Sequence, residues 1–173
     1  MRKILFFSLL VCSILSLCDT SFAYENEPNG FRGMKWGTPL DSFPTLKHFE
    51  TVKRYGGIEY YKKKEEVLKL GDVKLFLIKY GFWHNKFYEV EIWAQGEKDW
   101  RALKDLVFAK FGEGNKPDKD VEEYIWNGVI TNLRFSYLDF MDVGMFTMTS
   151  VEIKKQMEEQ VKQKAKEGTE DGF

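Results

Sequence analysis

The clearest hydrophobic pattern in the chain is a strict alternation of apolar and polar residues over residues 87–94. A period of two is typical of a half-buried β-strand. One face of this strand carries Tyr88, Val90 and Ile92, and the other carries Phe87, Glu89, Glu91 and Trp93. The preceding segment 75–78 is apolar on both faces, as a central strand can be. We therefore predict a long β-hairpin over residues 73–95 that turns at residues 84–86.

Further elements follow from the same kind of pattern. The pattern of residues 97–111 predicts a helix with one apolar stripe, made of Trp100, Leu103, Val107 and Phe111. We expect this stripe to cover the face of the hairpin that carries Val90. A short helix is expected after Thr38. Period-two segments predict strands at 49–54, 58–65, 123–126, 129–137 and 143–149. A last, mostly polar helix should begin after Thr149, with a thin stripe of Ile153, Met157 and Val161.

These elements predict an α+β fold, an antiparallel sheet of about five to seven strands with two or three helices packed on it. A short helix followed by about three strands occurs twice, which is consistent with a duplicated αβββ unit. We expect one domain over residues 31–166. A flexible lead-in at 24–30 should precede it, and a frayed tail at 167–173 should follow it.

The first 23 residues have the pattern of a secretory signal peptide. Arg2 and Lys3 precede an apolar run over residues 4–18, and cleavage is expected near Ala23. An uncleaved anchor is the alternative, but the run is shorter than the roughly 20 residues that a spanning helix needs. A lipoprotein site at Cys18 is a further alternative, which the bulky Leu17 disfavours. We therefore predict a periplasmic or secreted bacterial protein.

Composition narrows the candidate chemistry. The only cysteines are Cys12 and Cys18, so a mature chain would have no disulfide and no thiolate metal site. It would contain 24 basic and 26 acidic residues, a balance that argues against nucleic-acid binding. His48 and His84 lie far apart, which does not indicate a metal site. We found no signature of a cofactor site, a phosphate-binding loop or a serine nucleophile, and no later segment is apolar for long enough to span a membrane.

Several segments carry a resemblance to a known group of proteins. FRGMKWGT, YGGIEYY, KYGFWHNKFYEV and QKAKEG are similar to segments of short, signal-bearing proteins from Geobacter-like environmental bacteria. The resemblance runs over most of the mature chain. Because no activity is assigned to that family, it implies no catalytic residues. The order of elements also resembles small periplasmic α+β modules of the β-lactamase-inhibitor or outer-membrane-assembly-lipoprotein kind, a likeness of architecture alone.

The function that we infer is non-enzymatic binding of a protein, peptide or glycan partner in the cell envelope. The expected binding residues lie on the face of the sheet away from the helices: Trp93, Glu89, Glu91, Phe87, Arg134 and Asn132. Exposed aromatic residues among charges are typical of a recognition surface. The last helix could instead cover this face through its thin apolar stripe.

Two other functions remain open at this point. One is a hydrolase of cell-wall glycan or peptide that uses Glu89 or Glu91 together with His84. Glu89 and Glu91 would lie about 6.6 Å apart along the strand, which is near the carboxylate spacing of inverting glycosidases. However, neighbours on one strand point the same way and do not flank a bond. The other is a purely structural or stress-related periplasmic protein.

Overall fold

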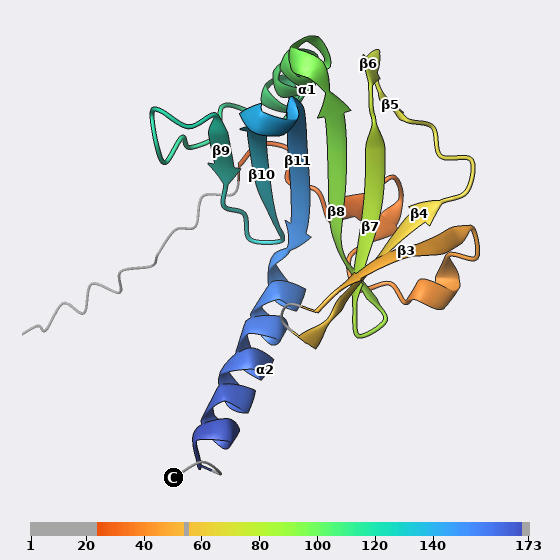
Figure 1. Ribbon diagram of the computed structural model, residues 1–173, viewed down its shortest axis with the longest axis vertical. Coiled ribbons are helices and arrows are strands. Elements are labelled where there is room, and N and C mark those ends of the chain that lie inside the picture. The colour runs from red at the N-terminus through yellow and green to blue at the C-terminus, as the bar shows by residue number, and fades with distance from the viewer. Residues whose placement is uncertain (1–23, 54–55, 171–173) are drawn as a thin grey trace, which may run out of the picture.

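The computed structural model describes residues 24–53 and 56–170. Its centre is a seven-stranded antiparallel sheet in the order β3-β4-β7-β8-β11-β10-β9 (Figure 1). In that order the strands are Leu46–Val52, Ile58–Lys63, Leu77–Trp83, Lys86–Gln95, Val143–Ser150, Thr131–Leu138 and Glu123–Trp126. The helices α1 (Gly96–Phe111) and α2 (Val151–Glu170) accompany the sheet. The predicted α+β fold class is therefore confirmed.

Short elements complete this part of the chain. Two small antiparallel ribbons pair β1 with β2 (Gly30–Phe31, Met34–Lys35) and β5 with β6 (Lys69–Leu70, Val73–Lys74). Two 3-10 turns lie at Leu40–Ser42 and Asp139–Met141. Four strands of the large sheet precede α1 and three follow it, and the duplicated unit stays a prediction. The predicted signal peptide lies outside the described residues.

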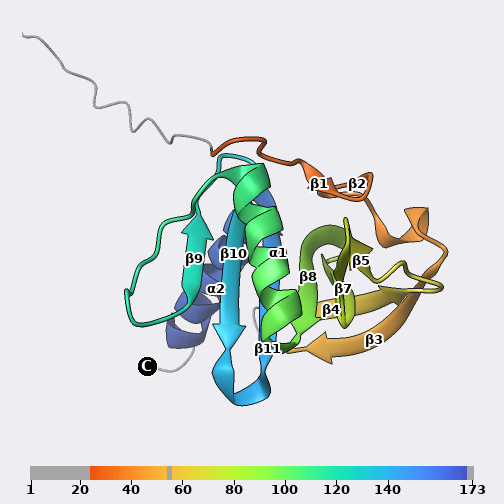
Figure 2. The same ribbon diagram turned by 90° about the horizontal axis from the view of Figure 1, so that it is seen from above.

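One face of the sheet, the inner face, is covered by α1 and by the N-terminal strap, residues 24–45 (Figure 2). The buried stripe of α1 is the one expected from its spacing: Trp100, Leu103, Val107 and Phe111. The strap adds Trp36, Leu40 and Phe43 to the same core. Gly144 in β11 makes the close approach of α1 feasible, because a Cβ there would lie 2.0 Å from Trp100 Cδ1.

The central hairpin turns at His84–Asn85. Both residues are left-handed, with φ of 46° and 64°, as a two-residue type I′ turn requires. The predicted hairpin is confirmed over residues 77–95. Its predicted first residues, Val73 and Lys74, pair with β5 instead. Cross-strand pairing then runs from Phe82–Phe87 directly to Gly81–Glu89. Tyr88 is the extra residue between these pairs, so β8 contains a β-bulge.

The bulge overturns part of the predicted face assignment. Val90 and Ile92 are buried in the inner core, as expected. Phe87, predicted to face outward with the binding residues, is instead fully buried in that core, with its ring centroid 4.8 Å from that of Trp36. Tyr88, predicted to lie beneath α1, packs on the opposite, outer face. Both assignments are wrong because one inserted residue reverses the alternation.

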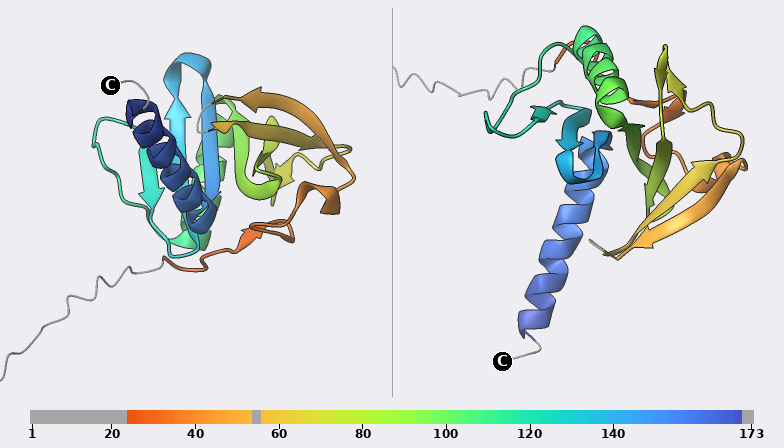
Figure 3. Two further views of the ribbon diagram at one scale, coloured as in Figure 1. Left: turned by 90° about the horizontal axis from the view of Figure 1, so that it is seen from below. Right: turned by 45° about the horizontal axis from the view of Figure 1, so that its top comes forward.

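Helix α2 begins directly after β11 and projects away from the sheet (Figure 1, Figure 3). Its first turn is capped by Ser150, whose Oγ accepts a 3.3 Å hydrogen bond from the Ile153 N–H, and not by Thr149 as predicted. Ile153 and Met157 are buried in a small outer-face core with Tyr60, Tyr88 and their neighbours. Val161, one turn further on, is 37% exposed. The helix therefore covers one end of the outer face.

Both ends of the described chain are more ordered than the sequence suggested. Within residues 24–30, Tyr24 donates a 2.8 Å hydrogen bond to the Thr131 carbonyl. Glu27 Oε1 accepts from the N–H groups of Ile130 and Thr131, at 2.6 and 2.8 Å. This segment is part of the folded domain, and α2 continues into the predicted tail as far as Glu170. No helix in the described residues is long and apolar enough to cross a membrane.

The contact of α2 with the sheet yields the first prediction. Met157→Ala should lower the free energy of unfolding by about 2–4 kcal/mol, because it removes a buried side chain and leaves a cavity. Val161→Ala, on the same helix face but 37% exposed and outside the buried core, should lower it by clearly less, about 1 kcal/mol or less. Urea denaturation of both variants measures the difference. Equal effects would mean that α2 is not anchored through Met157.

Candidate functional site

A group of polar and aromatic side chains lies on the outer face, across β3, β4, β7, β8 and β11. Neighbouring strands bring its members together by register, since Tyr60 pairs with Gly81, Gly81 with Glu89, and Glu89 with Thr149. We call it the outer-face cluster, and it consists of Glu50, Tyr60, Lys79, Glu89, Glu91, Trp93 and Thr149.

Glu89 is held by hydrogen bonds at both carboxylate oxygens. The Tyr60 hydroxyl donates to Oε1 at 2.5 Å, and the Thr149 hydroxyl donates to Oε2 at 3.3 Å. Gly81 lies between Tyr60 and Glu89 in the sheet. A Cβ at that position would be 3.1 Å from Tyr60 Cε1 and 3.3 Å from Glu89 Cβ. The absence of a side chain there therefore lets the tyrosine reach across β7 to the carboxylate.

This environment changes the protonation of both partners. Burial raises the pKa of the Glu89 carboxyl to about 7, against the hydrogen bonds from Tyr60 and Thr149, and the charge of Glu91 adds to the rise. Removal from water disfavours the charged form of an acid. Burial and the charges of Glu89 and Glu91 also raise the pKa of Tyr60, which keeps its hydroxyl a neutral donor. Glu89 can therefore gain or lose a proton near neutral pH.

Lys79 is the cation of the cluster. Its ammonium lies 2.6 Å from Glu91 Oε2 and 2.9 Å from Glu50 Oε1, and its side chain is 11% exposed. It also lies 4.6 Å from the centroid of the Tyr60 ring, within cation–π range. Burial lowers the pKa of Lys79, but the hydrogen bonds to Glu91 and Glu50 outweigh burial and leave the pKa raised. The ammonium is therefore fixed in its charged form between two carboxylates.

Trp93 is the half-buried aromatic residue of the cluster. Its Nε1–H donates to Glu91 Oε2 at 3.1 Å, and Lys79 Nζ lies 5.2 Å from its ring centroid. Its cross-strand neighbours are Leu77 on β7 and Met145 on β11. Along β8 it lies about 13 Å from Glu89 at the usual strand rise, away from the end that α2 covers. The ring thus adjoins both fixed charges and an apolar strip.

The structure places five of the six predicted binding residues on one face. Glu89, Glu91 and Trp93 follow one another along β8, and Asn132 and Arg134 lie two strands away on β10, in register with Glu89 and Glu91 through β11. Arg134 Nε is 2.7 Å from Glu123 Oε1. Asn132 Oδ1 accepts a 3.1 Å hydrogen bond from the Gly128 N–H. The sixth residue, Phe87, lies in the inner core as described above.

His84 does not join the carboxylates through any contact in the described part of the chain. Its Nε2 lies 3.1 Å from Gln160 Oε1 on α2, whereas Glu89 is bonded to Tyr60 and Thr149. His48 is hydrogen-bonded to Thr51 at 3.0 Å. Among the described residues there is no group of three or more histidine, cysteine or acidic side chains that could hold a metal ion.

Sequence reasoning missed four members of the cluster: Glu50, Tyr60, Lys79 and Thr149. Their signal was weak because each lies on a different strand from Glu89, and no spacing within one segment relates them. Tyr60 and Lys79 could have been found only with the correct strand order and the register across Gly81. Thr149 was assigned to a helix cap, a role that the adjacent Ser150 fills.

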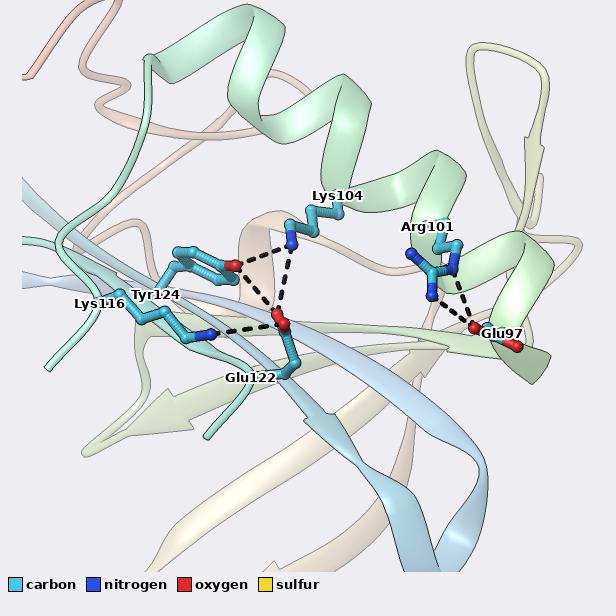
Figure 4. Close-up of polar contacts among 6 residues, drawn as sticks. All are labelled: Glu97, Arg101, Lys104, Lys116, Glu122 and Tyr124. Carbon is cyan, nitrogen blue, oxygen red and sulfur yellow. Dashed lines mark hydrogen bonds and ion pairs between the residues drawn. The ribbon is translucent and has the colours of Figure 1, made fainter. Parts of the chain in front are cut away.

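A second polar cluster lies on the other side of the molecule, between α1 and β9 (Figure 4). Lys104 Nζ donates to Tyr124 OH at 2.8 Å and lies 3.3 Å from Glu122 Oε2, while Lys116 Nζ is 3.4 Å from Glu122 Oε1. Burial raises the pKa of Glu122, but hydrogen bonds from Tyr124 and Lys104 outweigh it and leave the pKa lowered. These groups satisfy one another and tie α1 to the edge of the sheet, which is a structural role.

Comparison of the chain with protein-family models, with curated proteins and with solved structures found no significant match. The interpretation of the outer-face cluster therefore depends on its own geometry.

The raised pKa of Glu89 yields the second prediction. Because the folded state holds this proton more tightly, the contribution of Glu89 to stability is fully present below its ordinary value of 4.5 and is lost as pH rises through about 7. Glu89→Gln removes the titration. Between about pH 5 and about pH 8, the unfolding free energy of the wild type should fall relative to that of the variant by on the order of 2 kcal/mol.

The matched control is Glu65→Gln, since the Glu65 side chain is 86% exposed. This variant should keep the pH dependence of the wild type. Guanidinium denaturation at the two pH values measures all three proteins, and parallel behaviour of wild type and Glu89→Gln would show that Glu89 titrates in its ordinary range.

Proposed function

We propose that this protein is a secreted or periplasmic, non-enzymatic domain that binds a protein, peptide or glycan of the cell envelope through its outer sheet face. The observation that carries the proposal is the half-buried Trp93 beside a fixed Lys79–Glu91 pair. The face would present an aromatic ring together with donors and acceptors whose positions are already set.

Pre-organisation is the main physical support for binding. Lys79 and Glu91 are held by each other and by their neighbours, and their side chains are 11% and 15% exposed. A partner that contacts them would have little side-chain freedom to remove, and this lowers the entropic cost of association. Aromatic residues and arginine are enriched among residues that dominate binding energy. Trp93 and the exposed Arg134 meet that description on one face.

A hydrolase is the second candidate, because a carboxyl group that titrates near neutral pH can serve as a general acid or base. The geometry favours this reading less. Glu89 and Glu91 lie on one strand and point to the same side of the sheet, whereas a glycosidase needs carboxylates on opposite sides of the bond that it breaks. Glu89 also has hydrogen bonds to Tyr60 and Thr149, and His84 bonds to Gln160 on α2.

The proposed location in the cell envelope is inferred from the sequence. The proposed signal peptide, Met1 to Ala23, would deliver the chain across the inner membrane and leave it in the periplasm or the medium. A mature chain without cysteine would then fold there by packing alone, with the two apolar cores on either side of the sheet.

The third prediction tests the proposed surface. Trp93→Ala should reduce recovery of the partner at least about tenfold, the loss expected of a central anchor, and Arg134→Ala should also reduce it. Immobilised mature protein is mixed with solubilised envelope proteins and, separately, with purified peptidoglycan, and the bound material is quantified. Circular dichroism establishes that each variant is folded.

Phe49→Ala is the matched control, since Phe49 is an exposed aromatic on the edge strand β3 with Lys62 Nζ 3.5 Å from its ring centroid. It should bind as the wild type does. If Phe49→Ala and Trp93→Ala behave alike, Trp93 is not the anchor of the binding surface. If the wild type hydrolyses peptidoglycan and Glu89→Gln does not, the function is hydrolysis and not binding.

A further inference from the structure

The inner face contains a cavity of about 290 Å³. It is lined by residues of α1, the N-terminal strap and β5 together with the sheet beneath them. Figure 2 shows how these elements are arranged over the sheet. The sheet supplies Ile92, Phe146 and Met148 at its base, and all three are buried. The cavity exists because two separate pieces, a straight helix and an irregular strap, cover one sheet and do not fill the space between them.

The lining of this cavity is strongly asymmetric in polarity. The apolar walls above the sheet come from α1 and the strap, and their side chains are Leu106, Val107, Phe111 and Phe31. The charged residues among the described ones that line it are Arg32, whose side chain is 25% exposed, and the exposed Lys110. We place both at the rim. None of the described residues that line it is acidic. An apolar base beneath a cationic rim is complementary to a molecule with an apolar tail and an anionic head.

The two cations have different roles. Arg32 is engaged by the chain itself: it pairs with Glu66, and it donates to the carbonyls of Val67 and Lys69 at 2.9 and 2.5 Å. These bonds fix the strap to residues 66–69, at the start of β5, and hold one wall of the cavity in place. Lys110 has no carboxylate within ion-pair distance among the described residues, and its ammonium lies 5.5 Å from the Phe111 ring centroid. Its charge is therefore available to a ligand.

We propose that this cavity binds a single-tailed aliphatic carboxylate of medium chain length, with the tail among the apolar side chains and the carboxylate at Lys110. The cavity volume lies just below the usual range for small-molecule pockets, about 300–1,000 Å³. This size suits one tail and excludes a two-chain lipid. The site is separate from the outer face, so the inference stands or falls independently of the proposed function.

The first test measures chain-length and head-group dependence on the mature protein by calorimetric titration. Each methylene added between hexanoate and decanoate should tighten binding about fourfold, because each one moves from water into the cavity. Hexadecanoate should gain nothing further, since its tail exceeds the space. Decanol, which has the same tail and no charge, should bind about two- to fivefold more weakly than decanoate, the difference that one exposed ion pair supplies.

Variants locate the site. Leu106→Trp places a larger side chain in the cavity and should abolish decanoate binding. Lys110→Gln should weaken decanoate binding about two- to fivefold and leave decanol binding unchanged. Lys98→Gln, which alters an exposed lysine at the other end of α1, should bind both ligands as the wild type does. Equal losses in Lys110→Gln and Lys98→Gln, or unchanged binding by folded Leu106→Trp, would overturn the assignment.

A readout on the wild type does not depend on the folding of any variant. With methionine methyl groups labelled for NMR, decanoate should shift the resonance of Met148, which lines the cavity. Met145, on the same strand but on the outer face, and Met157 on α2 should not respond. Saturable binding that shifts Met145 instead of Met148, or no saturable binding at all, contradicts the proposal.

Discussion

The extra residue Tyr88 in β8 is the constraint on which both faces of the sheet depend. Between the turn and the bulge, Phe87 points to the inner face and completes the aromatic contacts with the N-terminal strap. Tyr88 points to the outer face and supplies the surface on which Ile153 and Met157 of α2 pack. Beyond the bulge the alternation resumes and places Glu89, Glu91 and Trp93 on the outer side. If the inserted residue were absent, the residues on one side of the bulge would shift by one position. Their side chains would then point to the opposite face of the sheet.

Helix α2 is linked to Glu89 through Tyr60. The packed turns of the helix lie over Tyr60 and Tyr88, and Tyr60 is the residue that donates to the Glu89 carboxylate. Burial raises the pKa of the Glu89 carboxyl, and the glycine at position 81 lets the tyrosine approach. The surroundings of Glu89 therefore depend on four structural features: the bulge at Tyr88, the glycine at position 81, the packing of α2 on Tyr60, and the strand order.

The sequence was informative where the relevant physics is local. Period-two segments located the strands of the large sheet to within a few residues, the three-and-four spacing located α1, and the stripe from Trp100 to Phe111 is the buried one. The bulge was not visible, because an inserted residue such as Tyr88 has the same apolar character as the residue that it displaces. The strand order was not visible either, so Lys79 and Tyr60 could not be associated with Glu89. Ser150 and Thr149 are both good caps, and only the geometry distinguishes them.

Stability alone does not account for the outer-face cluster. Lys79 and Glu91 are largely removed from water, with side chains 11% and 15% exposed. Such a pair typically contributes no more than apolar residues of similar volume would, since desolvation offsets the attraction. The inner face shows that this chain can fill a sheet surface with apolar and aromatic residues. On the outer face, the cluster instead places charged groups beside a half-buried indole in one fixed arrangement. Groups held in fixed positions can discriminate one partner from another. This is the physical support for the proposal that the outer face serves recognition.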